Sequence, residues 1–308
     1  MTHHIETESD VRAFYSMQTA ITDPGRYVAL YAKLPRDIAG LCDVLHQVII
    51  HMWWIRPDTY GFTLQDLKDA GRNPLAEIGL STAENRLARI QQLGSGSLTT
   101  PRAPMLRSVG NCRDFSLMLV SILRHRGIPA RARTGVARYF YPDGSKLEDH
   151  WICEFWNETT ARWQQVDAQI DEVMQNAINC TLDATDLPAN QFLNGWQCYA
   201  EVAEGRIEPE RIGFGSDLCG LTYARYKLFG DMAFVTGQEI LPWESWGIGD
   251  TSCRSDPGDT ALIQTMLELL RDIDSPKALE EARVLMATHS RLKQPHNYSP
   301  GPFLEEWL

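Results

Sequence analysis

Apolar residues recur at helical spacing through the first third of the chain. Between Ile38 and Ile49 they fall three or four positions apart, and this run directly follows Pro35-Arg36-Asp37, which is typical of a helix start. The segment from Ser81 to Glu84 offers a capping box for a second helix that reaches Leu93. Residues 9 to about 93 are therefore predicted to be mainly helical.

A loop rich in Gly, Ser, Thr and Pro runs from Gly94 to Pro104, and helical spacing then returns. The pattern predicts a helix from Asn111 to Arg126 with one apolar face. Gly127 stands just past its end and Pro129 follows. Glycine and proline in these positions commonly end a helix.

Three strand candidates come next. The first, Ala130 to Tyr141, stops at the turn signal Pro142-Asp143-Gly144-Ser145. His150 to Trp156 and Ala161 to Asp167 then flank the polar residues 157–160. Two strand candidates separated by a short polar segment are typical of a β-hairpin.

The remainder of the chain is predicted to be mainly helical. Helices are expected at about 189–203, 217–232, 259–273 and 276–288. A loop rich in Trp and Gly, residues 242–249, interrupts them. Its residues Trp243 and Trp246 are candidates for a lid, with packing as the competing interpretation.

This order of elements predicts an α+β fold in a single domain over residues 1–308. The domain would consist of a helical N-terminal region (1–105), a core (106–171) and a mainly helical C-terminal region (172–308). With 308 residues, 44% of them hydrophobic, the chain has enough apolar side chains for a full core.

Composition excludes several classes of function. The net charge of −11 leaves no broad cationic surface, so no nucleic-acid partner is expected. No apolar stretch approaches the roughly 20 residues that span a bilayer, and no basic N-terminal region precedes an apolar run. We therefore expect no membrane partner and a cytoplasmic location.

The seven cysteines are odd in number and scattered, unlike a secreted disulfide scaffold. At least one must be a thiol. No CxxC pair or CxxC with HxxxH spacing is present, so we expect no structural zinc and no metal or other cofactor.

Cys112 is the candidate nucleophile. A thiol attacks as the thiolate, and an isolated cysteine with a pKa of about 8.5 is mostly protonated at neutral pH. An Asn111 N-cap would place the sulfur near unpaired backbone N–H groups and the positive end of the helix dipole, which favour the thiolate. The same N–H groups would suit a developing oxyanion.

His150 and Asp167 are linked by counting along the predicted hairpin. If Trp156 pairs with Ala161, or Asn157 with Thr160, His150 lies directly opposite Asp167. Their Cβ atoms would then be roughly 4.5–5.5 Å apart, close enough for the carboxylate to hold the imidazole. A β-bulge would break this register.

The segment from about Arg107 to Asp171 resembles the catalytic core of transglutaminase-like cysteine enzymes. The family order of Cys at a helix start, then His and Asp on neighbouring strands, maps onto residues 110–114, 149–151 and 163–167, with spacings of 38 and 17 residues from Cys112 to His150 and from His150 to Asp167. The helical N-terminal segment, with Thr22-Asp23-Pro24-Gly25 and Leu34-Pro35, is also similar to bacterial transglutaminase-like proteins.

The resemblance implies a papain-like core, in which a nucleophile helix packs on an antiparallel sheet, with additional N- and C-terminal helices. It also implies chemistry through a thioester: amide hydrolysis, acyl transfer to an amine or protein crosslinking. Some members of the superfamily use the fold only for binding.

Further residues are assigned from their positions. Asn111, Trp151, Trp54 and Tyr60 are candidates for substrate binding, and for Trp54 and Tyr60 core packing is the competing interpretation. Cys153 lies an odd number of residues from His150 on the same predicted strand, so it should face the opposite side and belong to the core. The other cysteines, Cys42, Cys180, Cys198, Cys219 and Cys253, are assigned to packing.

The sequence thus predicts a cysteine-nucleophile enzyme with Cys112, His150 and Asp167 as its triad. It would act on a peptide, a protein or a small-molecule amide. Two alternatives stay open: a catalytically silent binding module, and a thiol redox sensor that would need a resolving cysteine. The substrate, the acceptor of the acyl group, the second oxyanion donor, the oligomeric state and the role of the C-terminal helices also stay open.

Overall fold

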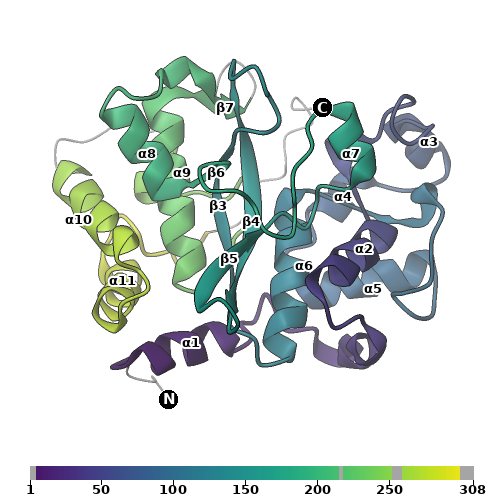
Figure 1. Ribbon diagram of the computed structural model, residues 1–308, viewed down its shortest axis with the longest axis horizontal. Coiled ribbons are helices and arrows are strands. Elements are labelled where there is room, and N and C mark those ends of the chain that lie inside the picture. The colour runs from purple at the N-terminus through teal and green to yellow at the C-terminus, as the bar shows by residue number, and fades with distance from the viewer. Residues whose placement is uncertain (1–4, 215–217, 252–258, 299–308) are drawn as a thin grey trace. The chain divides into compact units, whose positions relative to one another are not determined.

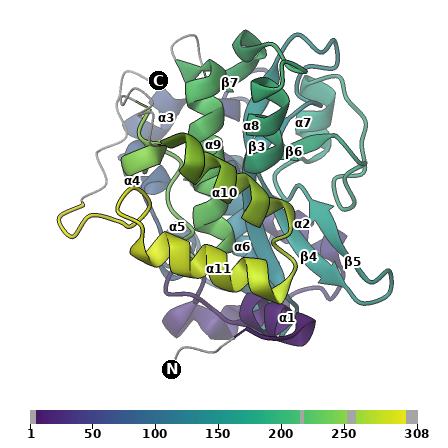
Figure 2. The same cartoon turned by 90° about the vertical axis from the view of Figure 1, so that its left-hand side faces the viewer.

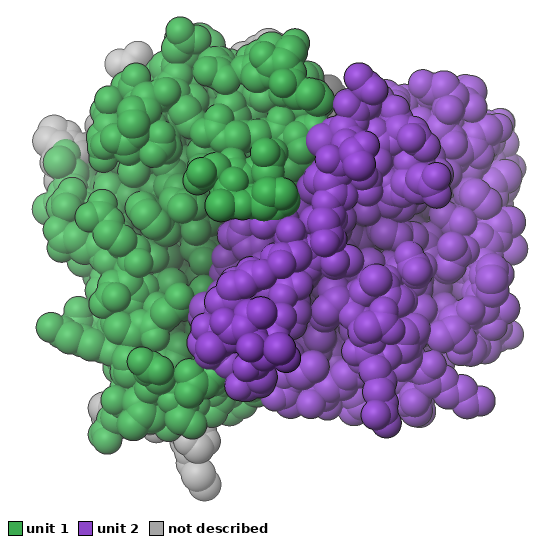
Figure 3. Space-filling model, in the orientation of Figure 1, with its two compact units in different colours: residues 1–17, 131–151, 188–301 green, residues 18–130, 152–187, 302–308 purple. Residues whose placement is uncertain are grey.

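A computed structural model describes residues 5–214, 218–251 and 259–298. The fold is α+β, as predicted. The chain forms two compact units, coloured separately in Figure 3. Unit 1 comprises residues 1–17, 131–151 and 188–301, and unit 2 comprises residues 18–130, 152–187 and 302–308.

Unit 2 holds most of the N-terminal helices and the predicted nucleophile helix. Its elements are η1 (Gly25–Lys33), α2 (Ile38–Val48), β1 (Ile49–His51), η2 (Met52–Trp54), α3 (Leu64–Asp69), α4 (Pro74–Ile78), α5 (Ala83–Leu93), η3 (Pro104–Leu106), β2 (Ser108–Gly110), α6 (Cys112–His125), β5 (Arg162–Val166) and α7 (Glu172–Ala177). The second part of β4 (Leu147–Asn157) also belongs to this unit.

The helix predicted to run through Ile49 ends one residue earlier. Ile49 to His51 instead form β1, which pairs in parallel with β2. A run of β-branched residues, Val48-Ile49-Ile50, favours the extended backbone at this point. A short strand, β1, is therefore added to a region predicted to be mainly helical.

Helix α5 reaches Leu93 as predicted, but its capping box is absent. Thr82 is the N-cap, and its side chain accepts a hydrogen bond from the backbone nitrogen of Asn85. Glu84 is engaged elsewhere, because its carboxylate accepts from the backbone nitrogen of Arg26 at 3.3 Å. A contact distant in sequence thus replaces the local one.

Helix α6 is buried on every side, rather than on the single apolar face predicted. Every residue from Cys112 to Arg124 is buried. Its polar side chains have partners inside the unit: Ser121 donates to the Thr22 carbonyl at 2.5 Å, and Arg124 donates to the Ala130 carbonyl at 2.8 Å. The helix ends as predicted before Gly127, whose φ of +72° suits glycine.

Unit 1 contains the C-terminal helices and most strands of the larger sheet. Its elements are α1 (Glu8–Ser16), β3 (Ala130–Ala137, from residue 131), the first part of β4, β6 (Phe192–Asn194), α8 (Gly195–Ala203), η4 (Pro209–Arg211), β7 (Ile212–Phe214), β8 (Leu218–Cys219), α9 (Gly220–Val235), η5 (Gly247–Gly249), α10 (Asp259–Arg271) and α11 (Pro276–Thr288). Figure 2 shows α10 and α11 side by side, next to α8 and α9.

Helix α1 joins unit 1 through a contact with the far end of the sequence. The Tyr15 hydroxyl donates to the carbonyl of Val235 at 3.0 Å, across 220 positions. Tyr15 is fully buried, and the Arg131 guanidinium lies 4.9 Å from the centre of its ring. The first helix therefore depends on residues that come much later in the chain.

The larger sheet has the strand order β6-β3-β4-β7-β8, with β5 also paired to β4 (Figure 1). The pairs β3–β6, β4–β5 and β7–β8 are antiparallel, as the family resemblance implied for the sheet. β4 and β7 are parallel, with Leu147 opposite Ile212. The sheet is therefore mixed, because the C-terminal region adds a strand that the sequence pattern does not indicate.

The hairpin forms, but its predicted register is wrong by two residues. Cys153 pairs with Val166, and Asn157 pairs with Arg162. The strands close over residues 158–161, with Ala161 at a φ of +49° and the Asn157 side chain accepting from the Thr159 nitrogen. His150 is therefore not directly opposite Asp167 in this ladder. A shift of two keeps each side chain on its predicted face.

The C-terminal helices agree closely with prediction where local signals are strong. Helix α11 spans the predicted residues, begins after the Ser275 N-cap and has Pro276 at its first position. Helix α8 begins later than predicted, because residues 192–194 pair with β3. The predicted start of α9 at residue 217 and the end of the tail, from residue 299, lie outside the described residues.

Candidate functional site

Cys112 is the first residue of α6, directly after the Asn111 N-cap. The Asn111 side chain accepts from the backbone nitrogen of Asp114 at 3.3 Å, and the Asp114 carboxylate accepts from the backbone nitrogen of Asn111 at 3.0 Å. This reciprocal capping box fixes the turn that carries the thiol. Cys112 is 8% exposed. The predicted N-cap is confirmed.

The carboxylate of this capping box is also bound by buried arginines. Arg86 donates to Asp114 at 2.7 Å, and both side chains are 1% exposed. Arg113 donates to the other carboxylate oxygen at 3.3 Å. Arg86 further donates to Ser108 and to the Val109 carbonyl, at 2.9 and 2.6 Å. One guanidinium therefore joins β2 to the first turn of α6.

Glu77, on α4, forms a hydrogen bond with strand β2. Its carboxylate accepts from the backbone nitrogen of Val109 at 2.8 Å and is also bound by Arg72 and Arg89. Burial acts to raise the pKa of Glu77, but the hydrogen bonds from Arg72, Arg89 and Val109 outweigh it, and the pKa is lowered. Glu77 is therefore held as a carboxylate.

Gly110 leaves little room for a side chain beside the capping box. A Cβ there would lie 3.0 Å from the Asp114 carboxylate oxygen and 3.0 Å from Cγ2 of Ile49. Gly110 also pairs with His51 in the short parallel ladder. A larger residue before Cys112 would therefore require the Asp114 carboxylate or Ile49 to move.

Asp167 lies in unit 2, directly after β5, and is fully buried. One carboxylate oxygen accepts from the backbone nitrogen of Gln169 at 2.9 Å, and the Asp167 nitrogen donates to the Ala184 carbonyl at 2.8 Å. Helix α2 presents Cys42 nearby. Burial, and to a lesser degree the charge of Asp167, raises the pKa of that thiol to about 12.

His150 lies in unit 1, on the first part of β4, and is 1% exposed. The rings of Tyr139 and Phe140 meet its imidazole edge to face, with centroid distances of 6.0 and 5.0 Å. Aromatic contacts of this kind limit the rotation of the imidazole.

Cys112 and Asp167 belong to unit 2, and His150 belongs to unit 1. Strand β4 runs through both: it carries His150 in one unit and Cys153 in the other, and Cys153 pairs with Val166, the residue before Asp167.

The predicted substrate-binding residues have varied surroundings. Trp54 is half-buried, with the Arg56 guanidinium 4.9 Å from the centre of its ring. Burial and the neighbouring Asp171 raise the pKa of Tyr60. Trp151 is 2% exposed and lies against the Lys227 ammonium. Their roles in binding stay predictions.

Asn111 has one feature that suits a binding role. Its side-chain oxygen serves the capping box, whereas its Nδ2 atom is buried and makes no hydrogen bond within the described part of the chain. A buried donor of this kind is costly unless it receives a partner.

The other cysteines assigned to packing are mostly buried. Burial raises the pKa of Cys153 and of Cys198, for Cys198 to about 12. Cys180 and Cys219 are partly exposed, and Cys253 lies outside the described residues.

The lid interpretation of the Trp-rich loop is wrong for Trp246. This residue is 4% exposed, its indole N–H donates to the Leu292 carbonyl at 2.7 Å, and its ring packs on Phe229. It is part of the core of unit 1.

Sequence reasoning missed the charged residues around the nucleophile turn. The Asn-x-x-Asp spacing of Asn111 and Asp114 was a usable signal for the capping box. Arg86 and Glu77 carry no local signal for this role, because Asp114 lies 28 positions from Arg86 and Val109 lies 32 positions from Glu77.

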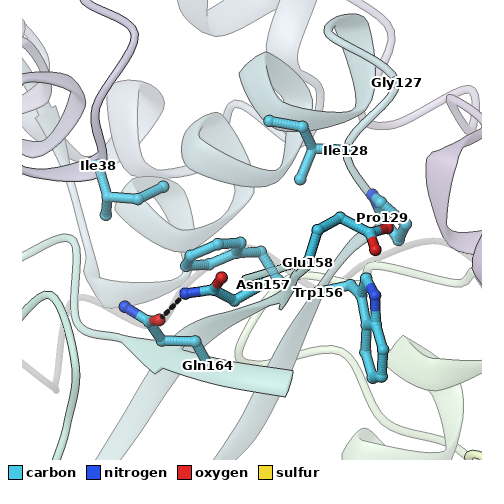
Figure 4. A pocket seen from close by; sticks show the side chains of 9 residues that line it. Ile38, Gly127, Ile128, Pro129, Trp156, Asn157, Glu158 and Gln164 are labelled. Carbon is cyan, nitrogen blue, oxygen red and sulfur yellow. Dashed lines mark hydrogen bonds between the residues drawn. The ribbon is translucent and has the colours of Figure 1, made fainter. Parts of the chain in front are cut away.

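An open hollow of about 420 Å³ lies elsewhere in unit 2 (Figure 4). Its apolar side chains include Ile38, Ile128 and Phe155, and Asn157 and Gln164 are joined by a hydrogen bond of 2.7 Å at its polar side. None of the predicted site residues lines it.

Among the described residues there is neither a cluster suited to a metal ion nor a helix suited to a membrane. No group of three or more His, Cys, Asp or Glu side chains within 5–214, 218–251 and 259–298 is arranged to hold a metal ion. None of the helices in those ranges combines the length and the apolar character needed to cross a bilayer.

The comparison with family models agrees with the resemblance seen in the motifs. Residues 91–168, about a quarter of the chain, match the model of the transglutaminase-like superfamily. A crystal structure of a "putative cysteine protease" from Cytophaga hutchinsonii shares 19% identity, with 53% of this chain and 47% of that chain covered and a TM-score of 0.20. The chain thus spans about half the length of that protein. A search of curated proteins found no match. The segment that contains Cys112, His150 and Asp167 is therefore similar to the transglutaminase-like superfamily.

Proposed function

We propose that the protein is a cysteine-nucleophile enzyme that acts on carboxamides through a thioester. Cys112 attacks the amide carbonyl carbon, and His150 accepts the thiol proton. As the C–N bond breaks, His150 returns a proton to the leaving amine. Water or a second amine then resolves the thioester, and Asp167 orients the imidazole and stabilises its charged form.

The observation that carries this proposal is the setting of Cys112. Its thiol begins a buried helix, behind a complete capping box. The first turn of such a helix presents backbone N–H groups and the positive end of the helix dipole, and both favour a thiolate. The match over residues 91–168 supports the proposal, because it contains all three triad residues.

We assign oxyanion stabilisation to the same turn. Backbone N–H groups at the start of α6 and the Nδ2 atom of Asn111 would donate to the developing charge. Asn111 is chosen because its Nδ2 atom is buried and, among the described residues, makes no hydrogen bond.

Peptides, proteins and small-molecule amides are all within this proposal, and no cofactor is needed for it. The chemistry balances with water or an amine alone, since hydrolysis and acyl transfer share the thioester and differ only in the acceptor.

Thiol reactivity across pH tests the proposal. Wild type, Cys112→Ala and His150→Ala are treated with dilute iodoacetamide, and the labelled cysteines are identified by peptide mass. We expect fast labelling of Cys112 with a pH midpoint below about 8.5, and a higher midpoint in His150→Ala. Cys180→Ser and Cys219→Ser remove two partly exposed thiols and serve as matched controls.

The labelling experiment, together with acylation and mild oxidation of the same proteins, separates the alternatives. Slow labelling spread over several cysteines contradicts the proposal. A reactive Cys112 that never forms an acyl adduct with p-nitrophenyl acetate indicates a binding module instead. A disulfide between Cys112 and a second cysteine after mild peroxide treatment indicates a redox sensor.

A further inference from the structure

Lys227, on helix α9, has a buried ammonium with several partners in unit 1. The residue is 0% exposed. Its Nζ atom forms an ion pair with Asp149, donates to the Thr134 hydroxyl at 3.1 Å and lies 3.6 Å from the centre of the Trp151 ring. The ring of Tyr226 is 5.2 Å away. An ammonium removed from water needs such partners, because its desolvation is otherwise costly.

Two of these partners flank His150 in the chain. Asp149 and Trp151 are the residues before and after it on β4. Side chains alternate along a strand, so Asp149 and Trp151 share one face and His150 projects from the other. Lys227 therefore contacts the residues on both sides of His150 in the strand. Its ammonium lies on the face of the strand opposite the His150 imidazole.

Helix α9 is itself fixed against β3 next to Lys227. One turn further along, Asp231 receives two hydrogen bonds from Arg133, at 2.7 and 2.8 Å, with both side chains nearly fully buried. Between them, a Cβ on Gly230 would lie 2.9 Å from Cγ2 of Thr134. This close approach sets where the Lys227 ammonium lies.

The opposite face of the strand, which carries the His150 side chain, is restrained as well. The rings of Tyr139 and Phe140 contact the imidazole at angles of 90° and 70°. These rings restrain the side chain of His150, and Lys227 restrains its backbone.

We infer that Lys227 is a positioning residue for His150, acting through Asp149 and Trp151. This inference rests on the proposed function, in which His150 transfers the proton of Cys112. A displacement of about 1 Å in a catalytic group costs about 100-fold in rate. A buried clamp on both neighbours of the imidazole limits such displacement.

The test uses the full chain with ¹⁵N-labelled histidine. The imidazole signals of His150 are assigned by their loss in His150→Ala. Lys227→Met removes the ammonium and keeps an aliphatic side chain, and Thr134→Val removes one hydrogen-bond partner with little change in shape. Lys277→Met is the matched control, because that side chain is 86% exposed.

We expect Lys227→Met to shift the His150 imidazole signals and to slow Cys112 labelling at pH 7 by about 10-fold to 100-fold. Thr134→Val should give a smaller shift in the same direction, and Lys277→Met should give none. A folded Lys227→Met protein with wild-type His150 signals and a wild-type pH profile overturns the inference. If Lys227→Met does not fold, unchanged His150 signals in Thr134→Val overturn it.

The outcomes also distinguish this inference from the proposed function. If His150→Ala leaves Cys112 labelling unchanged, the triad fails. The His150 signals in Lys227→Met still report whether the ammonium positions the imidazole.

Discussion

Arg86 donates to Asp114 at 2.7 Å, and both side chains are 1% exposed. Because the same carboxylate oxygen also accepts from the backbone nitrogen of Asn111, this ion pair is part of the turn that carries Cys112. A buried pair is not by itself evidence of high stability, since desolvation offsets much of the attraction. Its specific effect here is to fix the geometry at the start of α6.

Asp114→Asn should therefore destabilise the protein. It leaves two buried guanidinium groups, Arg86 and Arg113, without their carboxylate. We expect a loss of about 3–5 kcal/mol in the free energy of unfolding, measured by urea denaturation. Asp66→Asn is the matched control, because Asp66 completes a similar capping box on the exposed start of α3. Equal losses in the two variants would contradict this role.

The lowered pKa of Glu77 predicts an acid-dependent loss of stability. Its folded pKa lies below the usual 4.5. The stabilisation is therefore fully present above about pH 4.5 and is lost as the pH falls through the folded value. We expect Glu77→Gln to have a lower Tm than wild type at pH 7, with a gap that narrows between pH 5 and 3. Glu208→Gln, at an exposed position, is the control. A gap that stays constant with pH would show that Glu77 contributes only through its shape.

Asn111 allows its two roles to be separated. Asn111→Ser keeps an N-cap acceptor but removes the Nδ2 donor, whereas Asn111→Ala removes both. We expect the Ser variant to keep its stability within about 1 kcal/mol and the Ala variant to lose about 1 kcal/mol. Both should slow acylation of Cys112 by p-nitrophenyl acetate about 100-fold or more, as the loss of an oxyanion donor does. Wild-type acylation in Asn111→Ser would exclude the side chain from oxyanion stabilisation.

Gly110→Ala tests the close packing in front of Cys112. Its new Cβ would lie 3.0 Å from both the Asp114 carboxylate and Ile49. We expect a loss of about 1–3 kcal/mol and slower labelling of Cys112, measured by thermal denaturation and peptide mass. Gly79→Ala is the control, because its Cβ would meet backbone oxygens only at 3.5 Å or more. Similar behaviour of the two variants would count against a steric restriction at Gly110.

Local signals predicted the parts of the site that depend on neighbouring residues. The Asn111 cap, the start of α6 at Cys112 and its end before Gly127 follow from side chains within a few positions of one another. Helix α11 was equally predictable, from Ser275 and Pro276.

The missed features depend on residues far apart in sequence or on the geometry of a turn. The hairpin register was wrong because closure at Asn157 and Arg162, with Ala161 in the left-handed region, is set by backbone angles rather than by residue pattern. Strand β1 is three residues long and exists because β2 lies beside it. The periodicity of a single sequence contains no information on contacts between distant residues or on the backbone angles of a turn.

The bond between Tyr15 and Val235 has a consequence for the order in which the chain folds during synthesis. Translation delivers every described segment of unit 2 by residue 187, whereas helix α1 must wait for residue 235 to leave the ribosome before Tyr15 finds its acceptor. The unit that contains Cys112 can therefore begin to fold first, and the earliest helix of the nascent chain waits without its acceptor until Val235 has been made.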